Sequence, residues 1–240
     1  MRFKIEFKNS GIKRLPFGYQ YYLSSAVYNI LALVDPDYAE WLHSNGIKVG
    51  NRRYKPFVFS WLYASQKKVD KNGLILSGPI NWFISSPCSD FCNTFFRGIT
   101  KSGKLRVGAE TFYLKEMDIN TVFPNKIFKT LSPVVVSLSS PDGHTKYLSP
   151  ADPEYLKALK KNAILRRLLS EGRSVDDLNN LSNSFTLEIF DVHKKAVNYN
   201  GITIIAYNYS FKMSGDDAMI KFILEAGLGE KNSMGFGFVG

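Results

Sequence analysis

The sequence predicts an α+β fold made of two ferredoxin-like halves in tandem. The strand-like and helix-like segments of residues 2–119 follow the order β-α-β-β-α-β, which is the order of a ferredoxin-like unit. A second, shorter run of the same order begins near Ile127. The chain has 240 residues and is 45% hydrophobic, which suffices for one large domain or two small ones with a core. Although the halves share no evident sequence identity, we predict domains at 1–122 and 123–240, joined near residues 120–126.

The elements of the first half follow from periodicity and turn residues. Residues 2–7 alternate apolar and polar, which indicates an edge-accessible or half-buried strand. Helical spacing from Tyr19 to Val34 ends at Asp35-Pro36, which supplies the N-cap and first residue of a second helix over about 36–44. The other predicted elements are strands at 57–63, 74–76, 81–85, 104–107 and 111–119, a hairpin turn at 70–73, and a helix at 88–99.

The second half shows fewer and more polar elements. Pro133 interrupts a strand-like run at 128–137, and Ser214-Gly-Asp-Asp begins a helix that runs to a glycine-rich end. The other predicted elements of this half are a basic helix at 153–170 and strands at 185–190 and 203–213.

Charge and composition restrict the classes of function. The formal net charge of +10 favours an anionic partner, either nucleic acid or a membrane surface. No apolar run approaches the ~20 residues of a membrane span, and the N-terminus lacks the apolar core of a signal peptide, so we expect a cytoplasmic protein. No amphipathic basic helix with a large aromatic face supports binding to a membrane surface, so we expect no membrane partner. Cys88 and Cys92 have no nearby His or second Cys pair to complete a metal site, and we expect reduced structural thiols, no metal and no cofactor.

The last fourteen residues form the most informative stretch of the chain. They read Gly227-Leu-Gly-Glu-Lys-Asn-Ser-Met-Gly-Phe-Gly-Phe-Val-Gly240. Glycines allow positive φ and close approach to another molecule, and successive exposed N–H groups attract phosphate oxygens. No Gly-Lys-Ser/Thr follows the glycines, so the stretch is not a P-loop, and it lacks the preceding strand of a dinucleotide-binding turn. A flexible terminus is the alternative interpretation.

Candidate catalytic side chains are few. His43 ends the predicted second helix, just before a basic loop that carries Lys48, Arg52, Arg53 and Lys55. An imidazolium at a helix C-terminus is also favoured by the helix dipole, so a structural role for His43 stays open. His144 lies in a predicted turn and His193 at a predicted strand end, and we expect neither to be catalytic. The acidic pairs 176–177 and 216–217 read as helix starts, which gives metal-dependent nuclease chemistry little support.

Several segments resemble one known family from end to end. They are Pro16-Phe-Gly-Tyr-Gln-Tyr-Tyr-Leu-Ser-Ser-Ala-Val-Tyr28-Asn, Trp41-Leu-His43, Lys55-Pro-Phe-Val-Phe-Ser60, Thr130-Leu-Ser-Pro133, and the terminal Gly-Leu-Gly-Glu-Lys-Asn-Ser-Met-Gly-Phe-Gly. Together they look like the CRISPR-associated repeat-RNA endoribonucleases, the Cas-six family of the RAMP superfamily. The resemblance implies two ferredoxin-like (RRM-like) domains and cleavage of precursor CRISPR RNA within its repeats.

The resemblance also implies a catalytic set and a reaction. Carried over, the family's Tyr, His and Lys fall on Tyr28, His43 and Lys55. Lys48, Arg52 or Arg53 could occupy the place of Lys55, and Tyr28 could instead be a packing residue. The reaction needs no metal: the RNA's own 2′-hydroxyl attacks, leaving a 2′,3′-cyclic phosphate. Histidine transfers protons near neutral pH, and lysine supplies positive charge where negative charge develops. Whether His43 acts as acid or base stays open.

RNA contacts are expected to spread more widely than the catalytic set. The expected RNA-binding residues are Gly227, Gly229, Lys231, Asn232, Ser233, Gly235 and Gly237 in the terminal loop and Lys160, Arg166 and Arg167 in the basic helix. A solvated helix face is the alternative interpretation of those bases. The expected partner is CRISPR repeat RNA, as precursor and guide; other effector-complex subunits and a homodimer stay open. The competing hypothesis is a non-catalytic RNA-binding subunit of an effector complex.

Overall fold

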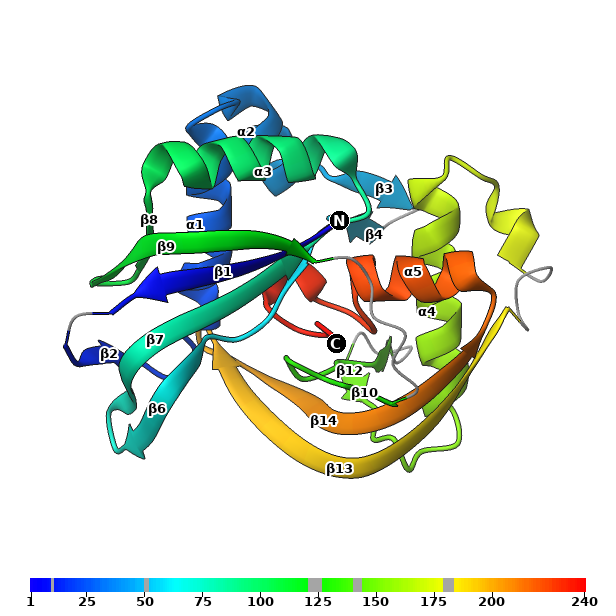
Figure 1. Ribbon diagram of the computed structural model, residues 1–240. Helices are drawn as coiled ribbons and strands as arrows, with labels where there is room; N and C mark the ends of the chain where they lie inside the picture. The colour runs from blue at the N-terminus through cyan, green and yellow to red at the C-terminus, as the bar shows by residue number, and fades with distance from the viewer. Residues whose placement is uncertain (10, 50–51, 121–126, 140–143, 179–183) are drawn as a thin grey trace.

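The N-terminal half is built on a large antiparallel sheet (Figure 1). The computed structural model describes residues 1–9, 11–49, 52–120, 127–139, 144–178 and 184–240. The main path of the seven-stranded sheet runs β2-β7-β1-β9-β8, and β5 and β6 also pair with β7. The strands are β1 (Arg2–Lys8), β2 (Lys13–Leu15), β5 (Val58–Phe59), β6 (Tyr63–Asp70), β7 (Gly73–Ser85), β8 (Lys104–Val107) and β9 (Glu110–Asn120).

Strand β1 lies in the centre of this sheet, between β7 and β9. Its alternation buries Phe3, Ile5 and Phe7 completely, so the predicted half-buried strand is confirmed and the alternative of an accessible edge is wrong. The predicted hairpin is confirmed too, since Asp70 pairs with Gly73.

Two predicted strand boundaries in this half are wrong. The segment 57–63 is divided between β5 and β6, because Ser60 turns its polar groups to β7: its hydroxyl accepts a hydrogen bond from the Phe83 amide at 3.0 Å. The two segments predicted at 74–76 and 81–85 are one strand, β7. Gly78, with φ of 74°, and Pro79 are accommodated inside it, near the bulge between Ala64 and Gln66 in β6.

Three helices accompany the first sheet, as the sequence predicts. They are α1 (Gln20–Ala32), α2 (Pro36–Ser44) and α3 (Ser89–Ser102). Asp35 caps α2, since its carboxylate accepts a hydrogen bond from the Tyr38 amide at 2.9 Å, and Pro36 is the first helical residue. Helix α3 packs closely on α1 at Gly98, where a Cβ would come within 2.2 Å of the Ile30 carbonyl oxygen. A short hairpin of β3 (Ile47–Val49) and β4 (Arg52–Tyr54) follows α2.

The C-terminal half combines a three-stranded sheet with two helices (Figure 1). The sheet order is β10-β14-β13, and an isolated bridge joins Thr130 to Val239 beside β10. Asp216 caps α5 by accepting hydrogen bonds from two amides, as its position predicts. The elements are β10 (Ile127–Lys129), β11 (Ser137–Ser139), β12 (Thr145–Tyr147), α4 (Tyr155–Ser170), the 3-10 turn Val175–Leu178, β13 (Phe185–Tyr199), β14 (Ile202–Gly215), α5 (Asp217–Ala226) and the 3-10 turn Asn232–Met234.

The hairpin of β13 and β14 is far longer than the sequence predicts. The β13 strand continues through the run from Asp191 to Lys195, whose side chains are all exposed and which the sequence therefore places at a strand end. The strand predicted at 128–137 does not continue through this segment. Strand β10 ends at Lys129, and Pro133 has no N–H group to donate to a neighbouring strand. The hairpin turns at Asn200-Gly201, with φ of 49° and 84°, the combination that a type I′ turn requires.

Contacts at Arg2 and at Gly18 are among those that pack the two halves together. The Arg2 guanidinium is buried and donates hydrogen bonds to the carbonyls of Leu224 at 2.8 Å and Val239 at 2.7 Å. The tip of the β13–β14 hairpin reaches the start of α1, where a Cβ on Gly18 would lie 2.2 Å from the Asn198 carbonyl oxygen. The proposed junction at 121–126 lies outside the described residues, so the domain boundary stays a prediction. In the described part of the chain, no helix is long and apolar enough to cross a membrane.

Candidate active site

Tyr28, His43 and Lys55 lie together although the chain separates them. The rings of Tyr28 and His43 meet edge to face, with centroids 4.9 Å apart and planes at 88°. The Lys55 ammonium lies 5.1 Å from the centroid of the Tyr28 ring and donates a 2.6 Å hydrogen bond to the His43 carbonyl. A phenol, an imidazole and an ammonium group are therefore gathered in one place.

The local structure explains this gathering. The Asp35-Pro36 break folds α2 back against α1, which brings the last turn of α2 to Tyr28. After the β3–β4 hairpin, the chain returns to the same helix end. There Lys55 and Arg53 donate hydrogen bonds to the carbonyls of His43 and Ser44. Cations at a helix C-terminus compensate the negative end of its dipole, so both side chains hold α2 and its His43 in place.

The alternatives to Lys55 are separated by this geometry. Arg53 lies beside it but bonds to the Ser44 carbonyl and lines a neighbouring cavity. Lys48, on β3, is exposed and lines neither of the two cavities at this site. The Arg52 side chain lies outside the described residues. Lys55 alone of the described three lines the cavity that holds Tyr28 and His43.

A cavity of about 410 Å³ opens over this trio. Residues from α1, α2, the hairpin tip and the terminal loop line it: Tyr21, Ser24, Ser25, Tyr28, Asn29, His43, Lys55, Tyr199, Ser233 and Met234. Among these described lining residues there is no carboxylate. Across the described chain, no group of three or more His, Cys, Asp and Glu side chains is arranged to hold a metal ion.

Burial changes the proton affinity of two members of the trio. Burial raises the pKa of the Tyr28 phenol, and neighbouring Tyr199 raises it further, against a smaller lowering by the Ser233 hydroxyl. Burial lowers the pKa of the Lys55 ammonium, and the charge of Arg53 lowers it further. Tyr28 therefore keeps its proton at neutral pH, so its hydroxyl is available as a hydrogen-bond donor.

The terminal glycine loop is a packed part of the structure. Leu228 and Phe236 in the loop are completely buried, so the interpretation as a flexible terminus is wrong. Two glycines show why this residue is needed. Gly229 has φ of 67° and a Cβ there would meet the Val135 carbonyl oxygen at 2.3 Å; Gly235 has φ of 87° and a Cβ would meet the Phe59 ring at 2.7 Å. Contacts inside the protein thus demand glycine at both positions.

Asn232 and Arg166 hold the loop in shape. The Asn232 amide donates to the carbonyls of Leu228 and Phe236, both at 3.1 Å. Arg166, only 5% exposed, donates to the Asn232 side chain at 2.7 Å and to the carbonyls of Ala226 and Gly227 at 2.9 and 2.6 Å. These hydrogen bonds hold the loop within the protein, and the RNA contact expected of both residues stays a prediction.

The other predicted RNA-binding residues divide by position. Arg167 is paired with Glu171 at 2.8 Å and Asp216 at 2.6 Å. Lys160 lies two helical turns before Arg167 on α4, with its ammonium 5.6 Å from the centroid of the Phe185 ring. Neither lines the two cavities at this site. Lys231 and Ser233, in contrast, do line them, from the turn of the glycine loop.

Six of the described residues that line the cavity were not predicted from the sequence: Tyr21, Ser24, Ser25, Asn29, Tyr199 and Met234. Tyr21 and Ser24 share the face of α1 that carries Tyr28, and the Ser24 hydroxyl donates to the Ser233 carbonyl at 2.8 Å. Their spacing of seven and four residues before Tyr28 could have indicated them. Tyr199 comes from the hairpin tip and meets the Tyr21 ring at a centroid distance of 5.7 Å. No local signal places Tyr199 here, because the contact joins the two halves.

The remaining histidines lie elsewhere. His193, on β13, lines a separate hollow with Lys129 and Asn208. His144, in the residue before β12, lines neither of the two cavities near the trio. Their expected non-catalytic character stays a prediction.

Comparison with known proteins gives a consistent match over the chain. The family described as CRISPR-associated protein Cas6, N-terminal, matches residues 14–118, and CRISPR associated protein Cas6, C-terminal, matches residues 114–240. A curated relative, CRISPR-associated endoribonuclease Cas6 1 of Methanocaldococcus jannaschii, is 33% identical over 246 residues, covering 100% of this chain and 92% of its own.

Two solved structures have similar folds. One is described as CRISPR associated protein Cas6, with a TM-score of 0.80, 31% identity, and coverage of 100% of this chain and 98% of the other. The second is described as an RAMP protein binding different RNA substrates, with a TM-score of 0.82, 25% identity, and coverage of 100% and 98%.

Proposed function

Because this chain belongs to the CRISPR-associated Cas6 family, we propose that it is an endoribonuclease that cleaves precursor CRISPR RNA within its repeats. The cleavage uses the 2′-hydroxyl of the RNA as nucleophile, needs no metal, and leaves a 2′,3′-cyclic phosphate on the upstream fragment. The observation that carries the proposal is the meeting of Tyr28, His43 and Lys55 at one cavity.

Each member of the trio supports one requirement of the reaction. His43 is exposed at the end of α2 and transfers a proton, either from the 2′-hydroxyl or to the leaving 5′-oxygen. Lys55 provides positive charge beside the developing charge on the phosphoryl oxygens. Tyr28, whose pKa is raised by burial, stays protonated and donates a hydrogen bond that positions the reacting groups.

The topology supports the proposed division into two ferredoxin-like (RRM-like) domains, at 1–122 and 123–240. In the first half, β9, β1, β7 and β6 lie side by side, with helices α1 and α3 in the two crossovers. In the second half, the segment at Val239, β10, β14 and β13 follow the same spatial order, with α4 and α5 in the crossovers. Both orders agree with a β-α-β-β-α-β unit.

A cleavage assay with EDTA tests the proposal. The full chain is incubated with end-labelled RNA of the repeat from its host's own CRISPR array. We expect cleavage at one position, and a fragment whose end resists phosphatase until acid opens the cyclic phosphate. A repeat with a single 2′-deoxy nucleotide at the scissile position should bind nearly as well and stay intact. Cleavage of that deoxy RNA would refute attack by the 2′-hydroxyl.

The second candidate function is a non-catalytic RNA-binding subunit of a CRISPR effector complex. One solved structure with a similar fold is described as an RAMP protein binding different RNA substrates, a description that names RNA binding and not cleavage. Tight binding of the intact repeat without any cleavage would favour this function. The enzyme is favoured by the meeting of Tyr28, His43 and Lys55 at one cavity, whose described lining residues include no carboxylate.

A further inference from the structure

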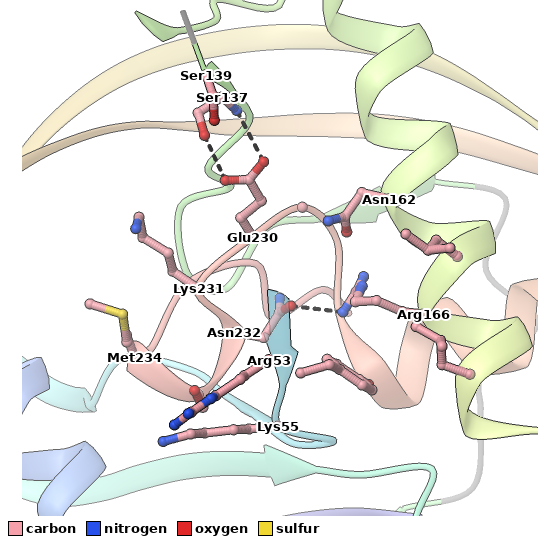
Figure 2. A pocket seen from close by; sticks show the side chains of 15 residues that line it. Arg53, Lys55, Ser137, Ser139, Asn162, Arg166, Glu230, Lys231, Asn232 and Met234 are labelled. Carbon is pink, nitrogen blue, oxygen red and sulfur yellow. Dashed lines mark hydrogen bonds between the residues drawn. The ribbon is translucent and has the colours of Figure 1, made fainter. Parts of the chain in front are cut away.

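A second cavity adjoins the trio and has no role in the reaction described so far. Its volume is about 500 Å³, and it shares Lys55, Ser233 and Met234 with the catalytic cavity. Its walls come from β4, helix α4 and the glycine loop (Figure 2). A substrate that occupies the catalytic cavity can therefore continue into this one past Lys55 and Ser233.

Three side chains that line this cavity, Tyr54, Asn162 and Arg166, each have a polar atom that is hidden from solvent and lacks a hydrogen-bond partner within the described part of the chain. Asn162 alone of these three is partly exposed, so it is the one within reach of a ligand. It extends from α4 toward the cavity, one helical turn before Arg166 (Figure 2). Its Oδ1 is hidden from solvent and has no hydrogen-bond partner within the described part of the chain. Nothing there holds this oxygen, and the terminal amide torsion is soft, so the amide can turn toward a ligand. A buried acceptor without a partner is unfavourable, which a ligand's N–H group would relieve.

Two neighbouring polar side chains, Asn232 and Glu230, are already engaged. Both parts of the Asn232 amide bond to the loop and to Arg166. The Glu230 carboxylate accepts hydrogen bonds from the Ser137 hydroxyl at 2.7 Å and the Ser137 amide at 3.4 Å. These contacts give the cavity rigid walls, which a site needs if it is to distinguish between ligands.

Charge is distributed unevenly around this cavity. Arg53 and Lys55, two residues apart, extend together along one side, and Glu230 lies on the opposite side (Figure 2). Lys231 adds a third cation from the loop. Leu165, Leu169 and Met234 provide apolar surface between them. This arrangement suits a phosphate along the cationic side and a flat, largely apolar base directed toward Asn162.

We infer that this cavity binds one unstacked nucleobase of the RNA substrate, next to the scissile phosphate, and that Asn162 reads the edge of that base. The inference rests on the proposed function, because the catalytic trio defines where the scissile phosphate lies. A carboxamide both accepts and donates, so it pairs with a base edge that offers an N–H group beside an acceptor. The predicted ligand is thus a nucleotide within the repeat, close to the cleavage site.

The test combines single abasic nucleotides with Asn162 variants. Repeat RNAs carry one abasic nucleotide at each of several positions around the cleavage site and a 2′-deoxy scissile nucleotide, so that binding is measured without cleavage. For the wild-type chain we expect one abasic position to weaken affinity by about 10-fold, within the range of one specific base contact. Asn162→Ala should weaken binding of the repeat that has all its bases by a similar factor. The abasic nucleotide at the sensitive position should then cause no further loss of affinity in this variant.

Controls separate this site from folding and from catalysis. Lys161→Ala alters an exposed neighbour on α4 and should respond to the abasic nucleotide as the wild type does. Asn162→Ser repeats the test with a second variant, and thermal unfolding of both variants reports their stability. The inference is overturned if no abasic position weakens the affinity of the wild-type chain. It is also overturned if, at every position, the Asn162 variant and the abasic nucleotide weaken affinity independently, so that their fold-changes multiply. If the wild-type chain cleaves the unmodified repeat but no abasic position weakens its affinity, only the base site is refuted. If one abasic position weakens affinity but the unmodified repeat is not cleaved, only the proposed catalysis is refuted.

Discussion

The Lys55 ammonium donates a 2.6 Å hydrogen bond to the backbone carbonyl of His43, so one catalytic candidate holds the helix end that carries the other. The same ammonium lies over the ring of Tyr28. Position and chemistry are thus coupled in this trio: a change at Lys55 alters both the local charge and the placement of the imidazole.

Replacing His43 by alanine should lower the single-turnover rate of repeat cleavage by roughly 10²–10⁴-fold, the range for loss of a general acid or base. Repeat affinity should change little, because phosphate contacts dominate such interfaces. His144→Ala and His193→Ala should keep most of the rate, since neither lines the catalytic cavity. Lys55→Ala should fall between, because it removes charge and one bond that holds the end of α2 but leaves the His43 imidazole itself in the chain. A wild-type rate for His43→Ala would show that the assignment is wrong.

The alkaline side of the pH–rate profile should report Lys55. Burial and the neighbouring Arg53 lower its pKa, so the ammonium loses its charge at a lower pH than an ordinary lysine does. The rate should therefore decline at a lower pH than the loss of charge from an ordinary lysine would give. Arg53→Ala removes a like charge, which raises the pKa of Lys55 and moves the decline to higher pH. Lys55→Arg should abolish that decline, since arginine stays charged. Single-turnover rates over pH 7–11, corrected for uncatalysed hydrolysis, give the measurement; an unchanged profile in both variants would exclude Lys55 as its source.

Alanine at Gly229 or Gly235 should destabilise the fold strongly. Both positions have positive φ, and the new Cβ would lie 2.3 Å from the Val135 carbonyl oxygen or 2.7 Å from the Phe59 ring. Overpacking of this kind costs about 1–3 kcal/mol in addition to the backbone strain. Gly103→Ala is a matched control, because φ is 61° but no atom lies within 4 Å of the added Cβ. Urea unfolding compares the three; equal losses would show that packing at the loop is not the constraint.

Lys231 and Arg166 should affect RNA binding by different routes. Lys231→Ala should weaken repeat affinity and reduce the slope of log K against log salt by about one, without loss of stability. Arg166→Met removes three hydrogen bonds to the loop, and should lower the free energy of unfolding by about 2–4 kcal/mol. Salt-dependent binding and denaturant unfolding of both variants separate the roles. A full salt slope for Lys231→Ala would remove Lys231 from the RNA contacts.

Much of the secondary structure could be predicted because its signals are local. The alternation of Phe3, Ile5 and Phe7 and the Asp35-Pro36 helix boundary depend only on neighbouring residues. The long β13–β14 hairpin could not be predicted in the same way. The middle of β13 is exposed and lacks an alternating apolar pattern, and the length of the hairpin depends on the pairing of β13 with β14.

By itself the sequence determined the chemistry available to this protein: a net charge of +10, one histidine at a helix end, and a glycine pattern shared with a known family. Only the tertiary structure decided how those groups are used. Arg166 and Lys231 look alike in a sequence, yet Arg166 is buried against the loop and Lys231 faces a cavity. The reason is that burial and hydrogen-bond partners arise from contacts between distant segments, whereas residue type and spacing describe only what a side chain is able to do.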